Sequence, residues 1–140
     1  SGLGKTHIAS SIGYGLIEQG HKVKFVAASA IVQQLQQAKR HLRLQDELVK
    51  LDKYSLLIVD DVGYVRKTEQ ETSVLFELIA HRYERHSMII TSNKSFEQWD
   101  ELFEDSTMTV AAIDRLVHHA TIIHCEGDSY RRKTALNKSK

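Results

Sequence analysis

The first six residues carry the residue types that bind phosphate groups. They read Ser-Gly-Leu-Gly-Lys-Thr, and Gly4, Lys5 and Thr6 fill the last three positions of the phosphate-loop pattern G-x-x-x-x-G-K-S/T, whose opening glycine would fall before residue 1. Glycines let backbone N–H groups wrap phosphate oxygens, a lysine reaches the β- and γ-phosphates, and a hydroxyl binds Mg²⁺. The pattern predicts a phosphate site; a glycine-rich helix start without a ligand is the alternative.

Two carboxylates follow the clearest apolar run of the chain. The run covers residues 54–59, and Asp60 and Asp61 end it about 55 positions after Lys5. In a nucleotidase, the first carboxylate of such a pair holds Mg²⁺ and the second orients or deprotonates the attacking water. The alternative is a solvated strand end, because aspartate commonly starts a turn. The spacing behind the lysine favours the nucleotidase pair.

Two further residues are candidates for the same chemistry. Asn93 closes the next apolar run, where its amide could position water near a γ-phosphate; an asparagine at a strand end is otherwise a common turn residue. Arg115 lies in a segment of helical periodicity. It could pair with Asp114 at the surface, or it could act as an arginine finger that reaches the nucleotide of a neighbouring subunit. Periodicity alone leaves both roles open.

Hydrophobic periodicity predicts the elements that hold these residues. Helices are expected at residues 6–19, 28–38, 69–84, 96–103 and 108–119, with most of 39–53 also helical, and strands at 23–26, 54–61, 88–93 and 121–124. Alternating strands and helices indicate an α/β fold with a mainly parallel sheet. Such sheets bind ligands at the carboxyl ends of their strands. Asp60, Asp61 and Asn93 should therefore share one rim with the phosphate loop.

Composition sets bounds on the class of protein. The chain has 140 residues, of which 41% are hydrophobic and 26% charged, as expected for one globular domain. No apolar run approaches the roughly 20 residues of a membrane span, so we expect no membrane partner. A single cysteine suits a reducing cytoplasm. The net charge of +1 does not by itself indicate a nucleic-acid-binding protein.

The sequence contains the segments GLGKTH (2–7), LLIVDDVGY (56–64), TSNKSFEQW (91–99), AAIDRLVHH (111–119) and GDSYR (127–131). Taken together, these five segments resemble the IstB family. These are AAA+ ATPases encoded beside transposases in insertion sequences, and they are related to the DnaC helicase loader. The resemblance spans residues 1 to about 132, and its motifs occur in the expected order.

The resemblance implies a role for each matched residue. Lys5 and Thr6 would be the Walker A lysine and the Mg²⁺-binding hydroxyl, and Asp60 and Asp61 the Walker B pair that binds Mg²⁺ and acts on water. Asn93 would be sensor 1. The arginine finger would be Arg115, sensor 2 would be Arg131, and the loop residues in contact with ATP would be Ser1, Gly2, Leu3, Gly4, Lys5, Thr6 and His7.

The chain departs from the family pattern in two ways. Asp61 stands where many AAA+ proteins carry a glutamate, so its reach to the attacking water is one methylene shorter. The front of the phosphate loop and the strand before it are also missing, and in AAA+ proteins that strand lies in the middle of the sheet. We therefore expect a P-loop NTPase three-layer sandwich that lacks this strand. Residues 1–125 would form a partial AAA+ ATPase domain, and residues 126–140 the sensor 2 segment with a basic tail.

The expected function is ATP hydrolysis in the service of DNA transposition. The resemblance implies ATP and Mg²⁺ as cofactors, duplex DNA and a transposase as partners, and a homo-oligomer in which Arg115 acts in trans. A DnaC-like loader of the replicative helicase is the nearest alternative. A P-loop small-molecule kinase and a non-catalytic remnant are alternatives of other classes.

Overall fold

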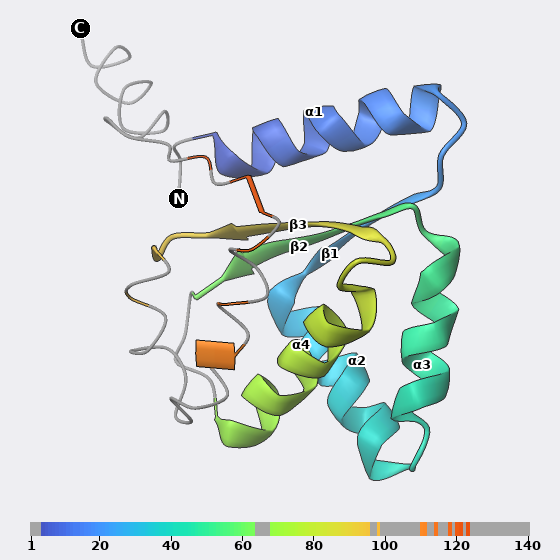
Figure 1. Ribbon diagram of the computed structural model, residues 1–140, viewed down its shortest axis with the longest axis vertical. Helices are drawn as coiled ribbons and strands as arrows, with labels where there is room; N and C mark the ends of the chain where they lie inside the picture. Colours follow the sequence, from blue (N-terminus) through green and yellow to red (C-terminus); the bar gives the residue numbers. More distant parts are fainter. Residues whose placement is uncertain are drawn as a thin grey trace, which may run out of the picture.

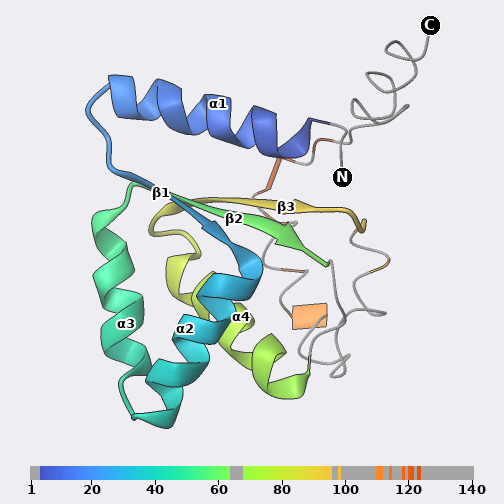
Figure 2. The ribbon, with the colours of Figure 1, turned by 180° about the vertical axis from the view of Figure 1, so that it is seen from behind.

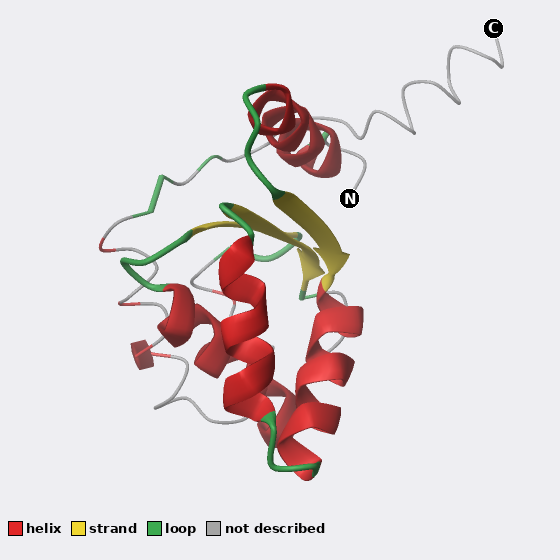
Figure 3. Cartoon of the chain, turned by 90° about the vertical axis from the view of Figure 1, so that its right-hand side faces the viewer, coloured by secondary structure: helices red, strands yellow, loops and turns green. Residues whose placement is uncertain are grey.

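The computed structural model describes residues 4–63, 68–95, 98, 110–111, 114, 118, 120–121 and 123. Its centre is a parallel sheet of β1 (Val23–Ala27), β2 (Leu56–Val62) and β3 (Ser87–Ser92), in the order β1-β2-β3 within the described part. Helix α1 (Lys5–Glu18) lies on one face of the sheet. On the other side lie α2 (Ala28–Arg40), α3 (Leu44–Lys50) and α4 (Glu69–Arg82), which gives the three layers seen in Figures 1 and 3.

The elements agree with the alternation that the sequence predicts. The bounds of the described strands and of α1 and α4 differ from the predicted ones by one or two residues. The segment 39–53, predicted to be mostly helical, holds α3 and the 3-10 turn η1 (Leu51–Lys53), and a turn at His41–Leu42 separates α3 from α2. The helices predicted at 96–103 and 108–119 and the strand predicted at 121–124 fall mostly outside the described residues. The predicted α/β class is confirmed.

The main core lies between the sheet and the layer of α2, α3 and α4. On β2, the side chains of Leu57, Val59 and Val62 point into this core and are completely buried. Leu56 and Ile58 point to the opposite face, toward α1, and are also buried. Burial on both faces explains why β2 appears in the sequence as a continuous apolar run rather than an alternating one.

Helix α1 packs on the sheet through small residues. Ala9 and Gly13 are the buried residues of this helix, and a Cβ at Gly13 would lie 3.1 Å from Ile58 Cδ1. The absence of a side chain at Gly13 therefore allows the helix to approach the sheet closely. This packing holds the start of α1 at the same end of the molecule as the carboxyl end of β2, as Figures 1 and 2 show from opposite sides.

Arg82 fixes the opposite end of the sheet. Its guanidinium is buried and donates hydrogen bonds to the carbonyl oxygens of Leu51 (3.0 Å), Tyr54 (3.0 Å) and Ser87 (2.8 Å). Burial lowers the pKa of Arg82 from its ordinary value, and the charge of Asp52 opposes that shift. The end of α4 is thereby tied to the residues that begin β2 and β3.

Candidate functional site

The start of α1 forms the first wall of the site. Gly4 is its N-cap with φ of +87°, a left-handed conformation that favours glycine. No side chain caps the helix, and its first turn holds no acidic residue. The free N–H groups and the positive end of the helix dipole are therefore open to an anion. Such an end is a common binding site for phosphate.

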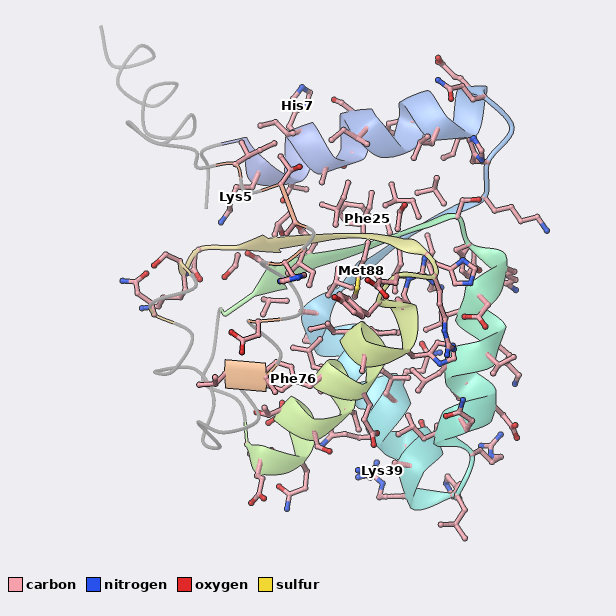
Figure 4. The ribbon with its side chains drawn as sticks, in the orientation of Figure 1. Lys5, His7, Phe25, Lys39, Phe76 and Met88 are labelled. Carbon is pink, nitrogen blue, oxygen red and sulfur yellow. The ribbon has the colours of Figure 1, made fainter. Side chains whose placement is uncertain are left out.

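Lys5 adds a charge that lacks a partner. Its Nζ atom is buried and has no hydrogen-bond partner among the described residues. In Figure 4 the Lys5 side chain points from α1 toward the level of the sheet, whereas His7 points away from it. An unpaired buried ammonium group is unfavourable, because burial removes its hydration without replacing it. The position fits a lysine that binds phosphate oxygens.

A direct hydrogen bond joins α1 to the carboxyl end of β2. The Thr6 hydroxyl donates to the Asp60 carboxylate, with Oγ1 3.0 Å from Oδ1 and 3.2 Å from Oδ2. The two residues are 54 positions apart in the sequence. A hydroxyl and a carboxylate together supply the oxygen ligands that Mg²⁺ prefers. The residues present therefore fit a magnesium ion bound beside the phosphates.

Asp61 lies beside Asp60 in an unusual backbone conformation. It is exposed, and its φ of +70° is left-handed, which is uncommon for a residue with a side chain. Its N–H donates a hydrogen bond to the hydroxyl of Thr91 on β3, at 2.8 Å. The same hydroxyl donates to Asp60 Oδ1. The neighbouring strand thus holds the Asp60 carboxylate and the backbone of Asp61.

The structure brings together some of the residues expected at the site. Lys5, Thr6, Asp60 and Asp61 lie at one end of the sheet, and Asn93 is exposed directly after β3, at the same end. Gly4 and His7 also lie at the start of α1, but the His7 side chain points away from the sheet in Figure 4. The other expected residues lie outside the described part of the chain: Ser1, Gly2, Leu3, Arg115 and Arg131.

Thr91 is the residue of this site that sequence reasoning missed. Threonine is common in strands, so its type alone gave no signal. A weak signal was present in Val62, an apolar residue directly after two aspartates, which suggests that the strand continues past them with an extra residue.

Metal binding at this site would rest on few protein ligands. In the described part of the chain, no three His, Cys, Asp or Glu side chains gather closely enough to hold a metal ion. A magnesium ion would therefore take Thr6 and Asp60 together with phosphate oxygens as ligands, as is usual for this ion.

None of the described helices has the length and apolar character that a membrane span requires.

The sequence is similar to proteins of insertion sequences. The family described as IstB-like ATP binding protein matches residues 1–138. An insertion sequence ATP-binding protein of Sinorhizobium fredii is 53% identical over 135 residues, which cover 96% of this chain and 45% of that protein. The IS21 ATP-binding protein of Pseudomonas aeruginosa is 40% identical over 132 residues, which cover 94% of this chain and 50% of that protein. The chain spans about half the length of these relatives.

The fold is similar to two solved structures of DNA replication proteins. The crystal structure of the DnaC helicase loader matches with a TM-score of 0.72 and 18% identity, over 89% of this chain and 73% of that one. AMPPCP-bound DnaA from Aquifex aeolicus matches with a TM-score of 0.71 and 19% identity, over 98% of this chain and 42% of that one. At these identities the likeness establishes a shared fold.

Proposed function

The chain belongs to the family of IstB-like ATP-binding proteins and has a P-loop AAA+ fold, and we propose that it binds and hydrolyses ATP as a helper in DNA transposition. The observation that carries the proposal is the contact between Thr6 and Asp60 beside the buried, unpaired Nζ of Lys5. It joins a phosphate-binding helix start to a carboxylate at the end of the adjacent strand. This combination is the core of a P-loop nucleotidase site.

Each residue of the site has a proposed task in hydrolysis. The free N–H groups at the start of α1 and the ammonium group of Lys5 bind the phosphates and stabilise the negative charge of the transition state. Thr6 and Asp60 hold Mg²⁺, which when bound neutralises charge on the β- and γ-phosphate oxygens. Asp61 accepts a proton from the attacking water or orients it, and Asn93 helps to position that water.

The proposed partners come from the relatives and from the family resemblance. The two relatives above are named as ATP-binding proteins of insertion sequences, which supports a role in transposition. From the family resemblance we add a transposase and duplex DNA as partners and the cytoplasm as location. We further propose that the protein forms a homo-oligomer. In it, Arg115 contacts the nucleotide bound to the neighbouring subunit, and Arg131 contacts the nucleotide bound to its own subunit. The likeness to DnaC concerns the fold alone and does not favour a helicase-loading role.

The proposal is tested by ATP turnover with and without duplex DNA. The protein expressed from its full natural reading frame should hydrolyse ATP, and Lys5→Ala and Arg115→Ala should each lower the rate strongly. Lys39→Ala is a matched control, because Lys39 is an exposed lysine of α2, far from Lys5 in Figure 4. Unchanged turnover in both site variants would overturn the proposal. Phosphorylation of a small acceptor without DNA dependence would instead indicate a kinase.

A further inference from the structure

Strand β2 contains a bulge at the two aspartates. Val59 pairs with Ile90, and the next pair along the two strands is Val62 with Ser92. Between these pairs, β2 contributes Asp60 and Asp61, whereas β3 contributes one residue, Thr91. Two residues therefore stand opposite one, which defines a β-bulge. Bulges of this kind are frequent beside active sites, where they redirect side chains.

The bulge changes which side chains reach the rim. Up to Asp60, side chains alternate regularly between the two faces of the sheet, and Asp60 lies on the face of α1, where it meets Thr6. In a regular strand, Val62 would point to that same face. Because Asp61 is the extra residue, Val62 instead returns to the core on the opposite face and is completely buried. Asp61 is left exposed at the rim with its left-handed backbone.

The hydroxyl of Thr91 forms hydrogen bonds with both residues of the bulge, Asp60 and Asp61. It accepts a hydrogen bond from the N–H of Asp61 at 2.8 Å and donates one to Oδ1 of Asp60. One hydroxyl group carries one donor and two acceptor positions, so it can make both bonds at once. Thr91 is 7% exposed, so little water is available to replace either bond.

We propose that Thr91 is a positioning residue for ATP hydrolysis: its hydroxyl aims the Asp60 carboxylate at the metal-binding position and fixes the backbone of Asp61. The inference rests on the proposed function, because it assigns these tasks within the same site. Thr91 lies near the end of β3, and Asn93 directly follows that strand. The Thr91 hydroxyl therefore ties the strand that leads into Asn93 to the strand that carries the two aspartates.

The hydroxyl, rather than the volume of the side chain, should carry this effect. Valine has nearly the same shape as threonine but cannot donate to Asp60 or accept from the N–H of Asp61. Serine keeps the hydroxyl and loses one methyl group. Removing a hydrogen-bond partner of a metal ligand typically lowers metal affinity or activity about 10- to 100-fold. Thr91→Val should show that loss, and Thr91→Ser should stay within about threefold of wild type.

The test measures ATP turnover as a function of Mg²⁺ concentration for the protein expressed from its full natural reading frame. Thr91→Val should raise the Mg²⁺ concentration at half-maximal rate, or lower kcat, by about 10- to 100-fold. Binding of a fluorescent ATP analogue without Mg²⁺ should be unchanged, because the hydrogen bonds of the Thr91 hydroxyl go to the two aspartates. Thr72→Val is the matched control. Thr72 is a fully buried threonine on α4 whose hydroxyl donates to the Thr68 carbonyl at 2.8 Å, and its loss should alter thermal stability alone.

Two results would overturn the inference: wild-type Mg²⁺ dependence and kcat in Thr91→Val, or a loss in Thr91→Ser as large as that in Thr91→Val. If Thr91→Val does not fold, Thr91→Ala removes the same hydroxyl and takes its place in the comparison. An inactive wild-type protein would overturn the proposed function and this inference with it. An active wild type with an unaffected Thr91→Val variant would overturn the inference alone.

Discussion

Replacing Asp61 with glycine should stabilise the fold and abolish hydrolysis. Asp61 has φ of +70°, a conformation that costs roughly 1–2 kcal/mol for most residues with a side chain and less for aspartate. Glycine adopts it freely but loses more backbone entropy on folding, by roughly 0.5–1 kcal/mol. The substitution also removes a negative charge next to Asp60. Because the relieved strain and the entropy loss are of similar size, we expect a net stabilisation of at most about 0.5 kcal/mol.

The assay combines thermal unfolding with ATP turnover. For a domain of this size, the expected gain for Asp61→Gly raises Tm by at most about 2 °C. Asp61→Asn is the matched control for chemistry, because asparagine tolerates the left-handed conformation but lacks the carboxylate. It should keep Tm near the wild-type value and lose turnover. Asp61→Ala should lower the free energy of unfolding by about 1 kcal/mol, because alanine lacks that tolerance.

Two results would refute this reasoning. A lower Tm for Asp61→Gly than for wild type would mean that the left-handed backbone is not a source of strain. Full turnover in Asp61→Asn would mean that the carboxylate neither orients the attacking water nor accepts its proton.

Two further predictions concern stability away from the site. Leu42 is 94% exposed and has φ of +58° at the turn that ends α2. Leu42→Gly should therefore raise the free energy of unfolding by about 1 kcal/mol, as measured by chemical denaturation, and leave ATP turnover unchanged. A lower free energy of unfolding would contradict this prediction. Arg82→Met removes the donor of three backbone carbonyls and should lower the free energy of unfolding by about 3 kcal/mol or more, as measured by urea denaturation. A change below about 1 kcal/mol would mean that the carbonyls find other donors.

The sequence predicted the elements of the site better than their packing. Apolar residues recur along α1 at helical spacing, yet Ile8, Ile12 and Ile17 are exposed in the structure. The buried positions are instead Ala9 and Gly13, because small residues let the helix axis come close to the sheet. Helical periodicity identifies a helix and its apolar residues, but the distance to its neighbour depends on the tertiary packing.

Hydrophobic periodicity also could not predict the backbone geometry of Asp60 and Asp61. The apolar run and its two terminal carboxylates predicted a strand end at the ligand-binding rim, and the observed contact of Thr6 with Asp60 agrees with that expectation. The bulge depends on the register between β2 and β3, which pairs residues about 30 positions apart, and a single sequence does not reveal it. Thr91 could be recognised only once that register was known.

Binding of Mg-ATP by a Lys5 variant tests the central claim most directly. Replacing a charged hydrogen-bond donor to phosphate should cost about 1.5–3 kcal/mol, so Lys5→Met should bind a fluorescent ATP analogue about 10- to 100-fold more weakly than wild type. Lys39→Met removes an exposed lysine of α2 and should bind like wild type. Equal affinity of Lys5→Met and wild-type protein, or an equal loss in both variants, would contradict a phosphate site at the start of α1.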